Sequence, residues 1–252
     1  MKIVVTVKQV PDPNVPGHLE SDNTLARDGE VTLDSGDESG IEIALRIKEL
    51  GEGEVVLLSM GPAGARDAIR KGLSMGADRG ILITDPNLAG ADALLTARAL
   101  AAAVAIEQPD LVVCATESYD GSSGMVPPML AELLGWPQLT FAKSLEIADQ
   151  IARVHRQTDT GYQVVEAPMP VVVTVTAAIA EPRYASLRGI MAARNKEVKQ
   201  FNLTELGVDP TGPVESIDRV ELAPPRSPGE IMVENGTAAD RIVALLRGAK
   251  VV

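Results

Sequence analysis

The sequence LVVCATESYDGSSGMVPPMLAELL, residues 111–134, shows the unit from which this chain is built. Residues 111–115 are an apolar run that is typical of a strand buried on both faces of a sheet. A polar loop follows, and residues 126–134 have the apolar content of a helix with prolines in its first turn. The same order of strand, loop and helix occurs four times before Gly135.

These repeated units predict an α/β fold with a doubly wound, mostly parallel, Rossmann-like sheet and right-handed crossovers. The expected strands are 2–7, 55–59, 80–84 and 111–115, and the expected helices are 41–50, 63–75, 92–107 and 126–134. Between the first strand and the first helix, residues 8–40 are polar and glycine-rich. We expect a loop there, with a short hairpin around residues 24–33.

After Gly135 the pattern changes to shorter segments, some of them alternating between apolar and polar residues. Residues 144–148, 151–157 and 163–167 are expected to be strands, with a turn at Asp159-Thr160-Gly161. They predict an antiparallel ribbon on the edge of the sheet. The β-branched run 171–176 then predicts one more buried strand.

The chain is expected to divide into an α/β nucleotide-binding domain, residues 1–200, and a C-terminal arm, residues 201–252. Residues 207–229 contain five prolines and no sustained period, so they cannot bury enough apolar surface to fold alone. A last helix is expected at 238–246. Two interpretations stay open: an arm that becomes ordered on a partner, or a flexible linker whose helix packs back on its own domain.

Composition narrows the class of function. The formal net charge is −12, and we expect no nucleic-acid partner because neutralising phosphates requires an excess of Lys and Arg. No apolar run approaches the roughly 18 residues of a membrane span, so direct membrane insertion is not expected. The N-terminus begins a strand at once without the pattern of a signal peptide, which favours a soluble, cytoplasmic protein.

Residues suited to direct catalysis are few. The only cysteine, Cys114, lies within an expected strand and should be a buried, small apolar residue. His18 lies in a polar loop, and His155 has no carboxylate or nucleophile beside it in the sequence. Trp136 is expected to pack in the core. We therefore expect no metal site, no catalytic residues and no enzyme activity of the chain alone.

The loop between Ala115 and Val126 is the best candidate for a binding site, because ligands of doubly wound sheets bind at the carboxyl ends of strands. It offers the hydroxyls of Ser122 and Ser123 and backbone N–H groups at Gly121 and Gly124, and we expect Pro127 or Pro128 to leave free amides facing an anion. Such a loop suits a mononucleotide phosphate, although a plain loop is an equal alternative. The chain has neither G-x-G-x-x-G after its first strand nor a Walker sequence.

A second notable stretch, EPRYASLRGIMAARNKEV, covers residues 181–198. Pro182 should end the preceding extended segment, and a short basic helix is expected over residues 186–196. Leu187, Ile190 and Met191 have the i, i+3, i+4 spacing of one helix face. They either dock another protein or pack in the core of this one.

This stretch resembles the signature of the β subunit of electron-transfer flavoprotein, which carries E-x-R-Y-x-x-L followed by I-M and a basic run. Residues 69–79, IRKGLSMGADR, are similar to a second segment of the same family. The resemblance covers residues 1–206. It implies that the loop at Leu187 anchors partner dehydrogenases by placing a leucine in their hydrophobic pocket, with Tyr184, Ile190 and Met191 around it.

The resemblance also implies two cofactors. AMP would bind structurally in this subunit, and FAD would sit mainly on the α subunit, at its junction with β. Carried over by position, the cofactor-binding residues are Thr6, Met60, Ala115, Thr116, Glu117, Ser118, Asp120, Gly121, Ser122, Ser123, Gly124, Met125, Val126 and Gln163. Residues 34–37 follow less securely, and Gln163 is placed in the ribbon turn, close to the flavin.

Some family positions differ here. The family commonly has T-G-Q where this chain has Val126-Pro127-Pro128, and N-P where it has Asp34-Ser35, while Pro13 and Gly36 replace aromatic residues. Bifurcating members hold a second FAD in place of AMP, and this alternative stays open.

The function implied is that of an electron carrier. Its partners would be an α subunit in a heterodimer, flavin dehydrogenases such as acyl-CoA dehydrogenase, and a quinone oxidoreductase or similar acceptor. The rival from another class is a stand-alone nucleotide-binding α/β protein, which explains the sheet and the serine-glycine loop but not E-P-R-Y-x-x-L.

Overall fold

A nine-stranded sheet organises the structure, a computed structural model that describes residues 1–210, 215, 217–221, 224, 229, 231–233 and 236–251. The chain separates into two units, Met1–Asp218 and Arg219–Val252. The strands of the large sheet lie in the order β11-β5-β4-β1-β6-β10-β7-β8-β9, and β2 pairs with β3 in a small separate sheet.

The strands are β1 (Lys2–Thr6), β2 (Gln9–Pro11), β3 (Val31–Leu33), β4 (Glu54–Met60), β5 (Arg79–Ile83), β6 (Leu111–Ala115), β7 (Gln138–Ala148), β8 (Ile151–Thr158), β9 (Gly161–Pro168), β10 (Val171–Val175) and β11 (Val198–Phe201). The helices are α1 (Ser35–Glu49), α2 (Arg66–Met75), α3 (Ala93–Glu107), α4 (Val126–Leu134), α5 (Leu187–Ala193) and α6 (Ala238–Gly248), with short 3₁₀ turns at Ala63–Ala65 and Pro86–Leu88.

From β11 to β7 neighbouring strands run parallel, and β8 and β9 continue the sheet antiparallel. Register brings Val4 beside Val56 and Val112, and Val112 beside Val172. Such parallel strands, buried on both faces, need helices on each side. One face packs against α1, α2 and α5, and the other packs against α3 and α4.

The sheet has a topological switch point between β1 and β6. From β1 the chain builds outward through β4 to β5, and α3 then returns it to β6 on the other side of β1. At such a point the loops leaving two neighbouring strands diverge, and a crevice opens at their carboxyl ends.

The predicted α/β class and the repeated strands and helices are confirmed. The first helix starts at Ser35 rather than at residue 41, because the Asp34 side chain accepts a hydrogen bond from the Gly36 N–H and caps it. The hairpin expected around residues 24–33 is wrong, since Val31–Leu33 pairs with Gln9–Pro11. Strand β11 was not predicted at all.

The antiparallel ribbon is also confirmed, with longer strands than the sequence indicated. The β7–β8 turn is made by Asp149 and Gln150, both with positive φ, which suits a two-residue hairpin. Gln163 was expected in a turn, but it lies within β9, paired across the ladder with Arg156. That prediction is corrected.

The unit Arg219–Val252 contains the predicted C-terminal helix, which runs from Ala238 to Gly248. Ile242, Val243 and Leu245 on this helix are exposed. Of the 23 residues in the proline-rich segment 207–229 assigned to the arm, 11 lie outside the described residues. No helix within the described ranges is long and apolar enough to cross a membrane.

Candidate functional site

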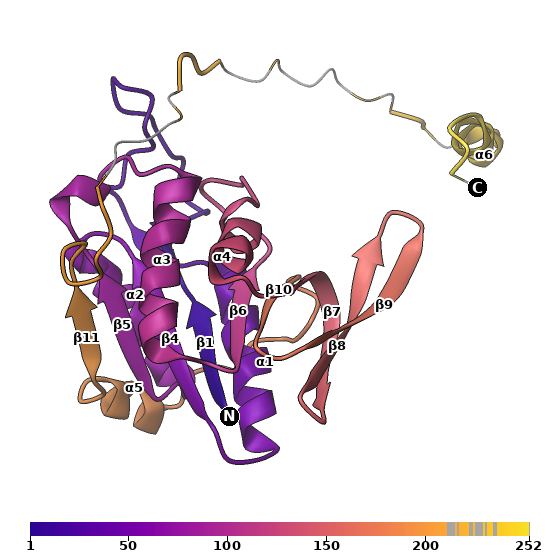
Figure 1. Cartoon of the computed structure of the whole chain (residues 1–252). Helices are drawn as coiled ribbons and strands as arrows, with labels where there is room; N and C mark the ends of the chain where they lie inside the picture. The colour runs from indigo at the N-terminus through magenta and orange to yellow at the C-terminus, as the bar shows by residue number, and fades with distance from the viewer. Residues whose placement is uncertain are drawn as a thin grey trace. The chain divides into compact units, whose positions relative to one another are not determined.

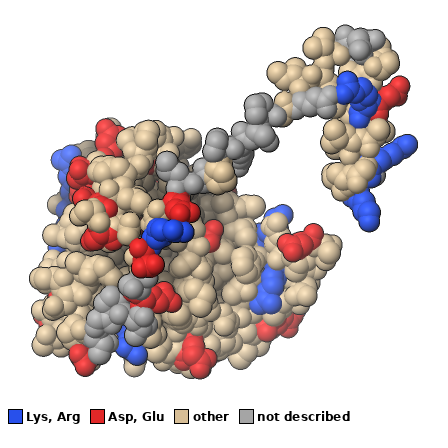
Figure 2. All heavy atoms as spheres, turned by 90° about the horizontal axis from the view of Figure 1, so that it is seen from above, with Lys and Arg blue, Asp and Glu red and all other residues tan. Residues whose placement is uncertain are grey.

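The candidate ligand site is the crevice at the switch point, where β1 and β6 end. Its walls are the loop after β1, the N-terminus of α1, and the loop between β6 and α4. Figure 2 looks onto this end of the sheet and shows acidic side chains spread over it with few basic groups between them. Three aspartates inside the crevice decide its local structure.

Asp34 joins two of these walls. Its Oδ1 accepts a hydrogen bond from the Gly36 N–H at 2.9 Å, and its Oδ2 accepts one from the Tyr119 N–H at 2.6 Å. The side chain is buried. Asp34 therefore holds the β6–α4 loop against the first turn of α1, using backbone amides only.

Asp37, one turn further along α1, is buried. Its Oδ2 accepts a hydrogen bond of 2.7 Å from the backbone N–H of Lys8. Burial raises the pKa of Asp37 well above its ordinary value, and the nearby Asp34 and Asp120 carboxylates raise it further. Asp37 thus ties α1 to the residue that follows β1.

Asp120 is the most heavily bound group of the crevice, with a side chain only 1% exposed. The Nζ of Lys8 donates to its Oδ1 at 2.7 Å, and the guanidinium of Arg27 forms an ion pair with its Oδ2. Burial by itself would raise the pKa of Asp120, but the bonds and charges of these cations outweigh it and lower the pKa. Both cations remain about 40% exposed and keep further N–H donors for solvent or a ligand.

Lys8 and Arg27 were missed from the sequence. Lys8 lies two residues beyond the carboxyl end of β1, which is the position where ligand contacts occur in such sheets. That position alone could have identified it. Arg27 belongs to an irregular loop, and no sequence pattern relates it to Asp120, which is 93 residues away.

The predicted loop residues gather at the crevice, but several of their hydroxyls are already engaged. Thr116 donates to the Val175 carbonyl, and Ser122 turns back to the Ser118 carbonyl. Ser123 accepts a hydrogen bond from the Met125 N–H. Ser122 and Gly124 have positive φ, a conformation that turns successive N–H groups toward a common side.

The N-terminus of α4 corrects one expectation. Pro127 and Pro128 were expected to preserve free amides for an anion, but a proline has no N–H at all. The amide of Met129 already donates to the Met125 carbonyl. In this turn only Val126 is left with a free N–H, so the helix terminus is a weak phosphate site. Positive charge for binding a phosphate would have to come from side chains.

Thr6, Met60 and Ala115 end three neighbouring strands at this edge, as predicted. The Thr6 hydroxyl forms a hydrogen bond with the Cys114 side chain, and burial raises the pKa of Cys114 to about 12. The cysteine therefore stays a neutral thiol, as its expected buried position implies. Gln163 is not part of this crevice, because β10, β7 and β8 separate β9 from β6.

The segment that follows β10 forms a second feature, organised by Arg183. Its Nε donates to Oε2 of Glu42 at 2.7 Å, and its Nη1 donates to Oε1 of Glu49 at 2.5 Å. Glu42 is buried and also accepts from Arg46 at 2.6 Å. Burial would raise the pKa of Glu42, but Arg183 and Arg46 outweigh it and lower the pKa. The segment is thereby fixed along α1.

Helix α5 is fixed on α2 by close packing and by hydrogen bonds. Gly189 lies so close to the Ser74 carbonyl that an added Cβ would overlap it. The guanidinium of Arg70 donates to the carbonyls of Ala193 and Lys196, and the Nζ of Lys196 donates to those of Leu73 and Ala77. These bonds fix the backbone of α5 near the amino ends of β5 and β11 (Figure 1).

The apolar residues of this segment point to solvent. The exposed fractions are 98% for Tyr184, 76% for Leu187, 63% for Met191 and 45% for Ile190. The interpretation that Leu187 packs in the core is therefore wrong. The helix observed, Leu187–Ala193, is shorter than the predicted 186–196. Its start is set by Ser186, the N-cap, which accepts from the Gly189 N–H at 3.0 Å.

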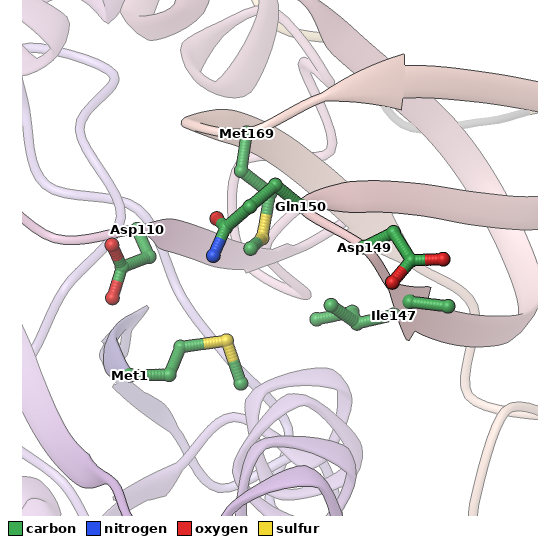
Figure 3. Close-up of a pocket in the computed structure, with 7 residues that line it drawn as sticks. Met1, Asp110, Ile147, Asp149, Gln150 and Met169 are labelled. Carbon is green, nitrogen blue, oxygen red and sulfur yellow. The ribbon is translucent and has the colours of Figure 1, made fainter.

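A further hollow of about 380 Å³ lies between the amino end of β1 and the β7–β8 turn. Figure 3 shows Met1, Asp110, Gln150 and Met169 facing one another across it, while Asp149 turns away. Asp110 already accepts from the Lys2 N–H at 2.7 Å. The lining is mainly apolar and has no reactive group, so we assign it no chemistry.

No catalytic set emerges in the part of the chain that the structure describes. His155 stacks on Tyr162, with ring centroids 5.1 Å apart, and no carboxylate orients it. Within the same residues there is no group of three or more His, Cys, Asp or Glu that could hold a metal ion.

Comparison with known proteins agrees with these features. The family model for the electron transfer flavoprotein domain matches residues 22–206. The chain is 39% identical over 263 residues to the electron transfer flavoprotein subunit beta of Mycobacterium leprae (strain TN), covering 99% of each chain. It is 40% identical over 211 residues to the subunit beta of Thermoanaerobacterium thermosaccharolyticum, covering 83% of this chain and 81% of the relative.

A third relative is the caffeyl-CoA reductase-Etf complex subunit CarD of Acetobacterium woodii, 35% identical over 213 residues, with 83% of this chain and 81% of the relative covered. The residues matched by the family model include α1, the β6–α4 loop, the Arg183 segment and α5, whereas β1 and Lys8 lie before the match. This chain therefore belongs to the electron transfer flavoprotein family, among its β subunits.

Proposed function

We propose that this subunit passes electrons from flavin dehydrogenases, such as an acyl-CoA dehydrogenase, through FAD held mainly by an α subunit to a quinone oxidoreductase or similar acceptor. The observation that carries the proposal is the exposed apolar set Tyr184, Leu187, Ile190 and Met191 on a fixed backbone. Exposed apolar groups cost free energy in water, so their concentration on one rigid segment favours a binding role.

The rigid backbone supports this proposal further. A docking side chain on a mobile loop would lose conformational entropy on binding, which weakens association. Here Arg183 bonds to two glutamates of α1, and Gly189 and Arg70 fix α5 on α2. Leu187 is therefore presented already ordered, and binding energy is not spent on ordering it.

Electrons would travel on a bound flavin rather than on side chains of this subunit. Cys114 is a buried thiol with its pKa raised to about 12, which keeps it out of thiolate chemistry. Redox chemistry without a redox-active side chain requires a cofactor, and the protein then supplies binding and orientation. We place the FAD at the junction with the α subunit.

We further propose that the switch-point crevice holds the phosphate end of AMP. The donors fit such a ligand in part: Lys8 and Arg27 are exposed cations beside the β6–α4 loop. The Ser122 N–H of that loop is already engaged by the Ser118 carbonyl. The prolines of α4 reduce the helix contribution. Bound there, AMP would be structural, tying the β6–α4 loop to the loop after β1.

A second FAD in this crevice is the alternative. Two exposed cations beside one loop, Lys8 and Arg27, would also suit a diphosphate. The stand-alone nucleotide-binding protein explains the crevice equally well, but it gives no reason for the exposed apolar set on α5.

We also propose that residues beyond 200 contact the α subunit, using the exposed apolar residues of α6, and that the complex is cytoplasmic.

The test of the proposed function is co-expression with a candidate α subunit, followed by purification, denaturation and measurement of the released nucleotides. One FAD and one AMP per heterodimer is the expected result. Two FAD and no AMP would establish the alternative, and a chain that purifies alone without flavin would contradict the proposal.

A further inference from the structure

The surface around α5 is basic, although the chain as a whole is acidic. Residues 183–199 hold five Lys or Arg side chains and one Glu, whereas the full chain has 23 basic and 35 acidic residues. The five cations are Arg183, Arg188, Arg194, Lys196 and Lys199. Arg183 is neutralised by Glu42 and Glu49, so the positive island beside the apolar docking set is formed by the other four.

A groove beside this set concentrates the charge. It lies between α2 and α5, has a volume of about 410 Å³, and is lined by Arg70, Lys71, Ser74, Ile190, Ala193 and Arg194. Three of these six residues are cations and none is a carboxylate. Because Ile190 belongs to the docking set, the groove is continuous with the surface that presents Leu187.

Two of the nearby cations are free to meet a partner. Arg70 donates to backbone carbonyls of the α5 segment, and Lys71 forms an ion pair of 2.5 Å with Glu38. Arg188 and Arg194 are exposed and form no ion pair with any residue that the structure describes. Their charges serve no evident purpose in the fold of this chain.

We propose that the protein which accepts Leu187 carries carboxylate side chains around its apolar socket, and that one of them enters the α2–α5 groove to pair with Arg194. The inference rests on the proposed docking function and adds the charge of the partner surface. A groove that is apolar at Ile190 and cationic at Arg194 fits a carboxylate on an apolar stem, such as a glutamate side chain.

The local charge has a specific consequence for association. A subunit of net charge −12 repels an acidic partner at long range, whereas the island around α5 attracts it locally. At low ionic strength the island therefore selects the orientation in which Leu187 meets its socket. Salt screens such interactions over about 10 Å at 0.1 M, so the contribution of Arg188 and Arg194 should vanish at high salt.

The experiment uses the complex with its α subunit and an acyl-CoA dehydrogenase reduced by butyryl-CoA as the electron donor. Stopped-flow absorbance gives the second-order rate constant for reduction of the carrier flavin in NaCl of two concentrations. For Arg188→Gln/Arg194→Gln we expect roughly a tenfold lower rate constant near 20 mM and less than about a twofold difference near 500 mM. Lys143→Gln is the matched control, because it removes an exposed charge on β7, across the sheet from α2 and α5.

A double variant with the wild-type rate constant at low salt would overturn the inference. A loss that persists at high salt would do the same, since it would indicate a change of structure. Leu187→Ala separates this failure from failure of the docking function. If Leu187→Ala is slow while the arginine variant is normal, the docking function holds and only the inference about the partner's charge fails. If Leu187→Ala is normal, the docking function fails and this inference fails with it.

Discussion

At the level of single residues, three buried aspartates hold the crevice together using donors that the chain itself supplies. Asp34 binds backbone amides, Asp37 binds the amide of Lys8, and Asp120 binds the side chains of Lys8 and Arg27. Buried carboxylates persist only when they are paired in this way. Of the sequence-based site, Asp120 was predicted and Asp34 and Asp37 followed less securely. Lys8 could have been identified by its position after β1, but no local pattern relates Arg27 to Asp120.

The raised pKa of Asp37 predicts a pH dependence of stability. The folded state keeps the proton to a higher pH than the unfolded chain, so ionisation of Asp37 opposes folding as the pH rises through that interval. We expect the free energy of unfolding of the wild type to fall relative to Asp37→Asn between pH 4 and pH 8. Urea unfolding at several pH values measures this difference, and a difference that stays constant with pH would contradict the raised pKa.

Arg183 gives a second prediction at this scale. Removing it leaves the buried Glu42 with Arg46 alone and frees the segment from Glu49. Arg183→Gln should lower the free energy of unfolding by about 1–3 kcal/mol and slow electron transfer from the donor, because a partly buried charge loses its bidentate partner. Arg183→Lys should recover part of the stability. Wild-type stability in Arg183→Gln would show that the segment is held by other contacts.

At the level of elements, the orientation of α5 explains why the sequence allowed two interpretations of Leu187, docking to another protein or packing in the core. Apolar residues at i, i+3 and i+4 usually mark the buried face of a helix. Here α5 is only seven residues long and contacts α2 chiefly through Gly189 and backbone carbonyls, so its apolar side chains face away. The pattern predicted the helix and its common face but could not say which way that face points.

Gly189 provides the test of this element. A Cβ at this position would overlap the Ser74 carbonyl, so Gly189→Ala should shift α5 away from α2 and lower both stability and the rate of electron transfer. Gly51→Ala is the control, because a Cβ there meets no atom within 4 Å. Thermal unfolding and stopped-flow reduction measure the two effects. Equal behaviour of both variants would show that α5 is not seated as described.

The other element-scale differences have physical causes of the same kind. Helix α1 begins six residues before its apolar period, because its start depends on the Asp34 cap and on polar residues that are buried by tertiary contacts. Strand β11 escaped prediction because Lys199 and Gln200 point to solvent at an edge where only four residues pair with β5. Long apolar runs were predicted well because burial on both faces leaves a clear signal.

At the level of the whole molecule, the unit Met1–Asp218 has its own sheet and both of its apolar cores. A chain ending at Asp218 should therefore fold, with a melting temperature within about 5 °C of the full chain. It should fail to co-purify with the α subunit, because the exposed apolar residues of α6 are missing. Retention of the α subunit by the truncated chain would contradict the role proposed for residues beyond 200.

The two functional regions lie at opposite ends of the sheet, the crevice at the carboxyl ends of β1 and β6 and the docking set near the amino ends of β5 and β11 (Figure 1). A change in one should therefore leave the other intact. This separation makes the docking claim testable without disturbing cofactor binding. It also means that loss of nucleotide and loss of donor recognition are distinguishable outcomes.

The most direct test of the account is the rate constant for reduction of the carrier flavin by an acyl-CoA dehydrogenase in Leu187→Ala, measured together with FAD content. Leu187 is 76% exposed, so its truncation should cost little stability. We expect the rate constant to fall at least tenfold, corresponding to about 1.4 kcal/mol or more of lost docking energy, with FAD content unchanged. An unchanged rate constant, or equal loss of flavin and rate, would contradict the docking role.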